Sequence, residues 1–241
     1  AELTTQQLVV VLILVASFAI LLFFLFKLNL TETSEKTICH DSVLKQSNFA
    51  QKAFERGYLD CKTEYICISG KEDCEGNFDR KIDIDIDEGK NKNEIFHVIA
   101  EEMADCWWMF GEGKIDYSGS GILVGKGYWA ICSIIKFDSK LKENFPDGIA
   151  VSEFLNYLAN SNFNSAKTYE TYFSVDGVYD KALYSDKIDF KKDYSIFTGI
   201  KNIEADINKK DYSFFPLSPV FLEKSKASYS QFGCEKFVTM G

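Results

Sequence analysis

Histidine is scarce in this sequence. His40 and His97 are the only two, and none of the seven cysteines stands in a C-x-x-C pair. Structural zinc sites need closely spaced cysteine and histidine ligands, and covalent haem attachment needs C-x-x-C-H. These spacings exclude both kinds of site, so we expect no metal and no other cofactor.

Catalytic motifs are missing as well. The sequence has no G-x-S-x-G elbow and no paired-carboxylate motif, so neither an acyl-transfer site nor a metal-hydrolase site has an anchor. His97 and Glu101 stand one helical turn apart, and they could flank a metal or form an ordinary contact on an exposed helix. We expect no catalytic residue and a protein that is not an enzyme.

Nucleotide-binding spacings are also lacking. The glycine-rich stretch over residues 111–128 has Ser120 where a phosphate-binding loop needs glycine, and Gly127 where it needs Ser or Thr. Val124 stands in place of the third glycine of a dinucleotide fingerprint. The stretch predicts a loop or a hairpin.

Positive charge is in deficit. The 27 Lys and Arg residues face 36 Asp and Glu, which gives a net charge of −9 and an isoelectric point near 4.9. Nucleic acid and anionic lipid headgroups repel such a chain, so neither is an expected partner.

Proline is rare too, and no Gly/Ser tract or repeat follows residue 30. We therefore expect one globular domain over residues 31–241.

A long apolar run, LVVVLILVASFAILLFFLF, fills residues 8–26. As a helix it would extend ~28 Å, about the thickness of the hydrocarbon layer of a bilayer. A helix that is apolar on every face must be surrounded by lipid or by protein, so it crosses a membrane or lies among copies of itself. A secretory signal peptide is not indicated, because no Lys or Arg precedes the run. Since the chain starts at Ala1, we expect that a short basic leader was removed.

The polar stub before this run carries a family resemblance. Its residues Glu2, Thr4, Thr5, Gln6 and Gln7 lead directly into the aliphatic and phenylalanine-rich segment, which resembles the mature start of archaeal type IV pilin-like proteins. The resemblance implies cleavage by a prepilin-type peptidase, packing of the helix in a filament core, and an outward-facing C-terminal domain. The bacterial form of the family has glutamate at the fifth mature position, where this chain has Thr5.

Self-assembly is therefore expected to use the N-terminal helix. The residues predicted to form its assembly surface are Glu2, Leu8, Val11, Val15, Phe18, Leu22 and Phe26. Glu2 either neutralises the amino terminus of a neighbouring subunit or is a solvated acid at a helix start.

Seven cysteines are many for a chain of this size. In an exported domain they are expected to form disulfides, or else they remain buried reduced thiols. The disulfide candidates are Cys39, Cys61, Cys67, Cys74, Cys106 and Cys132, of which the first four are expected to pair among themselves.

The triplet Asn29-Leu30-Thr31 is a glycosylation sequon, so Asn29 is a candidate glycan site.

Hydrophobic periodicity predicts a mixture of helices and strands. We expect the first helix to continue to residue 30, and others over 42–56, over 94–110 with Asn93 as N-cap, and over 152–160. Strands are predicted over residues 65–69, 81–87, 128–137, 169–175, 193–201, 212–222 and 235–240.

Residues 81–87, KIDIDID, alternate strictly between aspartate and isoleucine after Lys81. This pattern favours a half-exposed strand. The acids Asp83, Asp85, Asp87 and Glu94 also fit ligand positions of a calcium loop, but Glu88 stands where that loop needs glycine. We therefore prefer the strand.

Together these observations predict an α+β fold, with a long N-terminal hydrophobic α-helix over residues 1–30 and a mixed, β-rich globular domain over residues 31–241. The expected function is a structural subunit of an extracellular type IV pilus-like filament at the cell surface. The subunit would be a glycoprotein, inserted in the membrane before assembly, with a surface domain for adhesion or cell contact. The alternative is a single-pass membrane-anchored cell-surface protein or an envelope-complex subunit, and a third, weaker hypothesis is a tethered extracytoplasmic enzyme.

Overall fold

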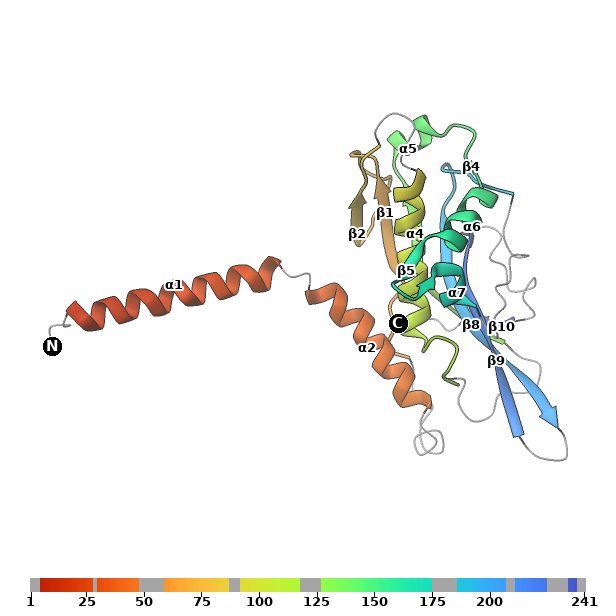
Figure 1. The fold of residues 1–241 in the computed structure, drawn as a ribbon, viewed down its shortest axis with the longest axis horizontal. Coiled ribbons are helices and arrows are strands. Elements are labelled where there is room, and N and C mark those ends of the chain that lie inside the picture. Colours follow the sequence, from red (N-terminus) through yellow and green to blue (C-terminus); the bar gives the residue numbers. More distant parts are fainter. Residues whose placement is uncertain are drawn as a thin grey trace.

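Two successive helices precede a domain of mixed helix and strand in a computed structural model of the chain (Figure 1). The structure describes residues 5–27, 30–47, 59–86, 92–117, 127–174, 186–206, 211–224 and 234–237. Helix α1 covers Thr5–Lys27 and helix α2 covers Leu30–Ser47. Side chains are described for residues 9–23 of α1 and 35–47 of α2.

A six-stranded mixed sheet forms the centre of the domain. Its main path runs β2-β1-β3-β8-β9, with bounds Arg80–Asp83, Glu64–Ser69, Gly127–Phe137, Tyr194–Asp206 and Asp211–Glu223. β1 is parallel to β2 and β3, whereas β8 is antiparallel to β3 and β9. β10 (Cys234–Phe237) pairs with the start of β3, so it lies end to end with β1 along one edge of β3.

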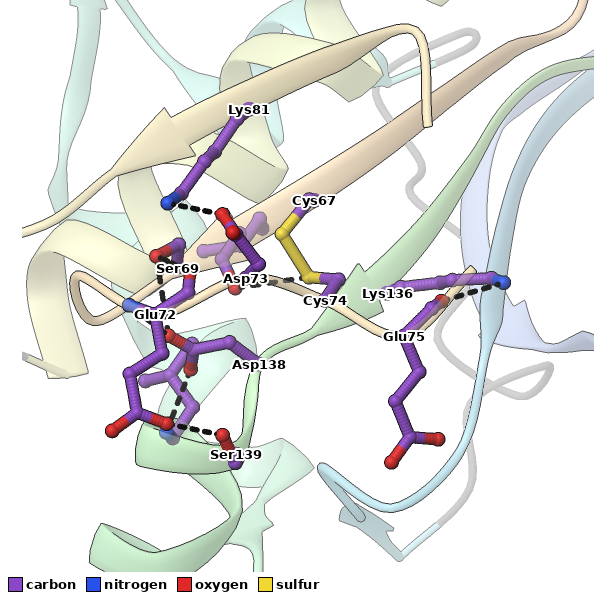
Figure 2. Close-up of a disulfide and its surroundings, with 12 residues drawn as sticks. Cys67, Ser69, Glu72, Asp73, Cys74, Glu75, Lys81, Lys136, Asp138 and Ser139 are labelled. Carbon is purple, nitrogen blue, oxygen red and sulfur yellow. Dashed lines mark hydrogen bonds and ion pairs between the residues drawn. A yellow bond between two sulfur atoms is a disulfide. The ribbon is translucent and has the colours of Figure 1, made fainter. Parts of the chain in front are cut away.

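The parallel neighbours β1 and β2 are joined without a helix. Their connection, residues 70–79, returns along β1, where the Asp79 N–H donates to the Tyr65 carbonyl oxygen at 2.7 Å. The Tyr65 N–H donates in turn to the Asp79 carboxylate at 2.9 Å. The Cys67–Cys74 disulfide ties the returning segment to β1 (Figure 2). Parallel crossovers usually take about a dozen residues or more, so this short one depends on these bonds.

Three helices pack on one face of the sheet (Figure 1). They are α4 (Lys92–Met109), α6 (Val151–Asn160) and α7 (Tyr169–Phe173). Apolar residues recur along α4 every three or four positions, so Ile95, Ile99 and Met103 are fully buried in the core. Phe154 of α6 meets Phe221 of β9 edge to face, with 6.0 Å between ring centroids.

Shorter elements complete the described part of the domain. They are helix α5 (Ser139–Asn144) and strands β4 (Ile149–Ala150), β5 (Asn162–Asn164), β6 (Lys167–Thr168) and β7 (Lys187–Ile188). β4 pairs with β7 and β5 with β6. Gly148 precedes β4 with a φ of 75°, and the Ile188 carbonyl oxygen lies against the place where a Cβ would stand. Only glycine fits this position without strain.

The predicted long N-terminal hydrophobic helix is wrong. Helix α1 ends at Lys27, short of the predicted end at residue 30, and Leu30 begins a separate helix, α2, whose sequence is mostly polar. The described apolar side chains of α1 form only a short, exposed segment over residues 9–23. Within the described part of the chain, none of the helices combines the length and the apolar content that crossing a membrane requires.

Other predicted elements also need correction. The helix expected over 42–56 begins at Leu30, and residues 48–58 lie outside the described part.

Residues 169–175, predicted as a strand, instead begin with helix α7. Thr168 caps this helix by accepting a hydrogen bond from the Thr171 N–H at 3.3 Å. Tyr169 and Phe173, four positions apart, are then both buried on one side of the helix.

Three boundaries differ by smaller amounts. Helix α4 begins at Lys92, so Asn93 lies inside the helix and is not its cap. Strand β2 ends at Asp83, although Ile84 is buried and Ile86 packs on the core. The predicted strand over 193–201 continues to Asp206, because β9 pairs with β8 along this extra length.

Candidate functional site

Apolar side chains are exposed along the whole described part of α1. Between 37% and 63% of each large apolar residue there is exposed, namely Val9, Val10, Val11, Leu12, Ile13, Leu14, Val15, Phe18, Ile20, Leu21, Leu22 and Phe23. At about 3.6 residues per turn, such a run faces every direction around the helix axis. No charged residue interrupts residues 9–23. The segment is therefore an apolar surface without a polar side.

The predicted assembly residues fall partly within this segment. Those with described side chains, Val11, Val15, Phe18 and Leu22, are all exposed. Leu8 and Phe26 belong to α1, but their side chains lie outside the described part. Glu2 and the glycan candidate Asn29 lie outside the described residues altogether.

Helix α2 follows α1 and is fixed to the domain. The Cys39–Cys61 disulfide ties it to the segment before β1. The His40 ring stacks on Trp108 of α4 with 4.2 Å between centroids, and His40 Nδ1 lies 2.8 Å from the Trp108 carbonyl oxygen. Because a carbonyl oxygen can only accept, Nδ1 carries the proton. A covalent bond and a stacked ring thus hold α2 in place.

A cleft of about 460 Å³ opens where α2 and α4 meet strands β1, β2 and β3. The register of the strands sets its floor. Glu64 of β1 pairs with Ser133 of β3, and Arg80 of β2 pairs with Ile66 of β1. Alternate residues of a strand share a face, so Glu64 and Arg80 lie on the same face as the core residue Ile66, toward α4. The cleft is therefore a polar corner of the layer between sheet and helix.

Arg80 forms the centre of this corner. Its Nε donates to Glu64 Oε1 at 2.8 Å, and its Nη2 donates to Glu64 Oε2 at 3.2 Å and to Glu102 Oε1 at 2.6 Å. Burial acts to lower the pKa of Arg80, but the hydrogen bonds and charges of the two carboxylates together raise it above its ordinary value. Arg80 therefore remains a cation in the folded protein.

Glu102 is the most deeply buried carboxylate of the cleft, at 6% exposure. Burial raises its pKa, and the opposing charges of Lys36 and Arg80 reduce this rise without reversing it. Lys36 Nζ lies 4.0 Å from Glu102 Oε2 and 2.7 Å from Asp105 Oδ2. The charges lining the cleft nearly balance, with the acids Glu35, Glu64, Asp79, Glu102 and Asp105 facing the bases Lys36, Lys62, Arg80 and Lys81.

Two serines of the sheet hold buried hydroxyls. Ser133 is 2% exposed and Ser195 is 1% exposed, and neither Oγ has a hydrogen-bond partner among the described residues. Ser133 lines the cleft. Ser195 pairs with Ile134, the next residue of β3, so it faces the opposite side of the sheet. Buried polar groups are nearly always paired, so these two hydroxyls are exceptions within the described part of the sheet.

The six cysteines named as candidates lie in three disulfides, Cys39–Cys61, Cys67–Cys74 and Cys106–Cys132. Cys106–Cys132 joins α4 to β3, and both Cys39 and Cys132 line the cleft. Cys234 begins β10, where side chains are outside the described part.

A buried aspartate supports the region around the Cys67–Cys74 disulfide (Figure 2). One oxygen of Asp138 accepts from the Gly70 N–H at 2.7 Å and from the Glu72 N–H at 3.0 Å. The other oxygen accepts from the Leu141 N–H at 2.9 Å and so caps α5. Asp138 thus fixes the turn after β1, and its role is structural.

His97 and Glu101 meet at a tyrosine of α7. The Tyr169 hydroxyl donates to Glu101 Oε1 and lies 3.2 Å from His97 Nδ1. Burial and then the hydrogen bond to Glu101 raise the pKa of Tyr169 well above its ordinary value. The Tyr169 hydroxyl therefore stays protonated and joins the two side chains. Within the described residues, no group of three or more His, Cys, Asp or Glu is arranged to hold a metal ion.

Two aspartates of the alternating stretch over residues 81–87 form contacts in the structure. Asp85 forms an ion pair with Lys71, and the backbone N–H of Asp85 donates to Glu94 Oε2 at 2.9 Å. Asp83 lies 3.4 Å from Lys81 Nζ. Asp87 is outside the described residues.

No protein-family model, no curated protein and no solved structure matches this chain. The resemblance of its N-terminal segment to archaeal type IV pilin-like proteins therefore stays a prediction.

The charged cleft was missed by the sequence reasoning. Its residues come from five helices and strands and from the segments just before β1 and β2, and they are far apart along the chain, so no spacing motif connects them. One local signal was present in α4. Glu102 stands three residues after Ile99, on the stripe of α4 that is otherwise apolar. A carboxylate at a core position indicates a buried cation opposite to it.

Proposed function

We propose that this chain is a structural subunit of an extracellular pilus-like filament, in which α1 helices of many copies pack together and the disulfide-bonded domain lies outside. The observation that carries the proposal is the exposure of apolar side chains on every side of α1 over residues 9–23. A contiguous apolar surface of this extent marks an interaction site. Copies of the same helix supply apolar cover on all sides.

The extent of this surface favours an assembly over a dimer. The large apolar side chains of the segment are about half exposed, and burying the exposed part of each stabilises by roughly 1 kcal/mol. Complete cover then contributes on the order of 10 kcal/mol per helix. A single partner covers only one side of each helix, so a dimer gains about 10 kcal/mol over its two helices, a value within the ~4–15 kcal/mol that association costs, and it leaves the other side of both helices exposed. Several neighbours around each helix are therefore needed.

The three disulfides support a location outside the cytoplasm, because such bonds persist in oxidising compartments. The Cys39–Cys61 disulfide holds α2, the helix that follows α1 in the chain, against the domain. In the proposed filament, α2 and this outer domain form one unit, and we propose that the domain serves adhesion or cell contact.

Reversible assembly of the purified full chain tests the proposal. On removal of detergent, the wild-type chain is expected to form filaments that sediment and are visible by electron microscopy. Val15→Lys places a charge at a position of α1 that is 61% exposed in the single chain and buried in the filament. Burying an unpaired ammonium costs several kcal/mol, so the concentration needed for assembly is expected to rise at least ~100-fold.

Leu44→Lys is the matched control, since it adds the same charge at an exposed apolar residue of α2. This variant is expected to assemble like the wild type. A wild-type chain that stays monomeric in plain buffer, or equal assembly of the Val15→Lys variant, would contradict the proposal. Recovery as single copies held in lipid vesicles would point instead to an anchored surface protein.

A further inference from the structure

A small pocket at one end of the sheet is rich in lysine, although the whole chain carries a net charge of −9. We call it the basic pocket. Its volume is about 120 Å³, and the charged residues of its lining are the lysines Lys136, Lys142, Lys191 and Lys192 and the acids Glu75 and Asp193. Lysine is therefore in excess here, against the charge of the protein as a whole.

Only part of this positive charge is neutralised. The ammonium of Lys136 donates to the carbonyl oxygen of Glu75 at 3.3 Å, which is a neutral partner (Figure 2). Lys192 forms an ion pair with Glu223 at 2.9 Å. Within the described residues, the ammonium of Lys142 has neither a hydrogen bond nor an ion pair. Lys142, near the end of α5, is therefore the cation that is best placed to meet an incoming acid.

The outer part of the larger cleft carries the opposite charge, and we call it the acidic mouth. It consists of the four most exposed charged side chains of the cleft lining, Glu35, Lys62, Asp79 and Asp105, which are between 38% and 57% exposed. Asp105 has its own partner in Lys36, at 2.7 Å. Lys62 is shared between two acids, at 3.4 Å from Asp79 and 4.0 Å from Glu35. Glu35 is the most exposed of the three acids and the most weakly paired.

The basic pocket and the acidic mouth lie on opposite faces and at opposite ends of the parallel strands. Glu64, which lines the same cleft as the acidic mouth, begins β1 and faces α4. Lys136 lies near the end of β3 and pairs with Cys67, the neighbour of Ile66, so it faces away from α4. Figure 1 likewise shows α5 at the upper end of the domain and α2, which carries Glu35, toward its lower end. One copy therefore cannot bring its own two surfaces together.

The size of the basic pocket favours a protein surface over a small molecule. Small-molecule sites usually enclose ~300–1,000 Å³, well above the volume of this pocket. A carboxylate on a neighbouring surface needs no such enclosure. Exposed carboxylates are what the acidic mouth of another copy supplies.

We infer that the basic pocket of one copy docks against the acidic mouth of the next copy in the filament, with Lys142 facing Glu35. A contact between two different surfaces is heterologous, and its repetition gives an open helical filament when the rotation does not close. The inference rests on the proposed function and adds to it a second contact, between the outer domains. Complementary charge sets the register of neighbouring copies more than their affinity, which the packing of α1 supplies.

A charge swap in the full chain tests this contact. Lys142→Glu and Glu35→Lys each replace an attraction by a repulsion, and each is expected to raise the concentration needed for assembly about fivefold, as sedimentation measures it. The double variant, which carries both substitutions, restores the attraction in reverse and is expected to assemble like the wild type.

Lys140→Glu is the matched control. It makes the same change of charge on the same helix, at an exposed residue that does not line the pocket, and it is expected to assemble like the wild type. The inference is overturned if the double variant assembles no better than the single variants, or if Lys140→Glu is as defective as Lys142→Glu. Restoration that fails while inorganic phosphate binds the wild type but not Lys142→Glu would show that the pocket holds a free anion instead.

Zero-length crosslinking separates this contact from the packing of α1. A carbodiimide joins a lysine to a carboxylate that touches it, and a mixture of ¹⁵N-labelled and unlabelled chains identifies links between copies. Assembled wild-type material is expected to show links from Lys142 to Glu35 of another copy. Filaments without links between the two surfaces would overturn this inference and leave the proposed function intact. A wild-type chain that does not assemble would overturn both.

Discussion

Replacing Arg80 with methionine tests how the charged cleft is held together. The substitution keeps an unbranched stem in place of the aliphatic part of arginine but removes the guanidinium group and its three hydrogen bonds, two to Glu64 and one to Glu102. The buried Glu102 carboxylate then loses its nearest cation. Breaking a buried ion pair in this way costs roughly 3–5 kcal/mol of stability. Because the side chains of Arg80 and Glu64 are 22% and 20% exposed, we expect a loss of ~3 kcal/mol, the lower end of that range.

The stability lost on Arg80→Met is expected to become smaller as the pH falls. Burial raises the pKa of Glu102 in the wild type, and removal of the Arg80 charge, which lowers that pKa, raises it further. A carboxyl group whose pKa is higher in the folded state than in the unfolded state binds protons preferentially in the folded state. The contribution of the Glu102 carboxyl group to the free energy of unfolding therefore increases as the pH falls through its folded-state pKa. The difference between Arg80→Met and the wild type should be largest at neutral pH and smaller in mild acid.

Urea unfolding with the disulfides intact measures this difference, with tryptophan fluorescence as the signal. Lys81→Met is the matched control, because its ion-pair partner Asp73 is 80% exposed and solvent-exposed pairs of this kind contribute little to stability. Adding Glu102→Gln to Arg80→Met should restore part of the loss, since no buried charge then remains unpaired at residue 102. An Arg80→Met loss no larger than that of the control, or a loss that grows in acid, would refute the reasoning.

Two further predictions concern the frame around the cleft. Replacing Cys106 and Cys132 together with alanine opens a bridge between residues 26 apart, and calorimetry is expected to show a loss of ~3.5 kcal/mol; an unchanged melting temperature would contradict this. Gly148→Ala is expected to cost more than the ~1 kcal/mol of Gly76→Ala, since both have positive φ but only Gly148 has a backbone oxygen, that of Ile188, against the added methyl group. Equal urea midpoints for the two variants would show that the close approach has no effect.

Local sequence patterns predict the elements whose burial follows a simple period. Strands β1, β3 and β9 and helix α6 begin and end within one residue of the predicted bounds. Their β-branched and aromatic runs, or the i, i+3 and i+4 spacing of apolar residues in α6, depend little on distant contacts.

Segments whose structure depends on distant contacts were not predicted well. Residues 169–173 are rich in aromatic side chains, which is typical of a strand, but the Thr168 cap and the packing of Phe173 make them a helix. The first half of α2 has no apolar period, and its described part is held by the disulfide of Cys39 and by the contact of His40 with Trp108. The charged cleft was missed for the same reason, since only the fold brings Arg80, Glu102 and Ser133 together.

Photocrosslinking at Phe18 tests the central claim most directly, that copies of α1 cover one another. Phe18 is 63% exposed in the single chain, and p-benzoylphenylalanine at this position should crosslink to whatever covers it. In detergent-free assembled material, the account predicts crosslinks between copies, joined through residues 9–23, and none between copies when the probe stands at residue 44 on α2. Crosslinks from residue 18 that reach only lipid, or only the same copy's own domain, would contradict it.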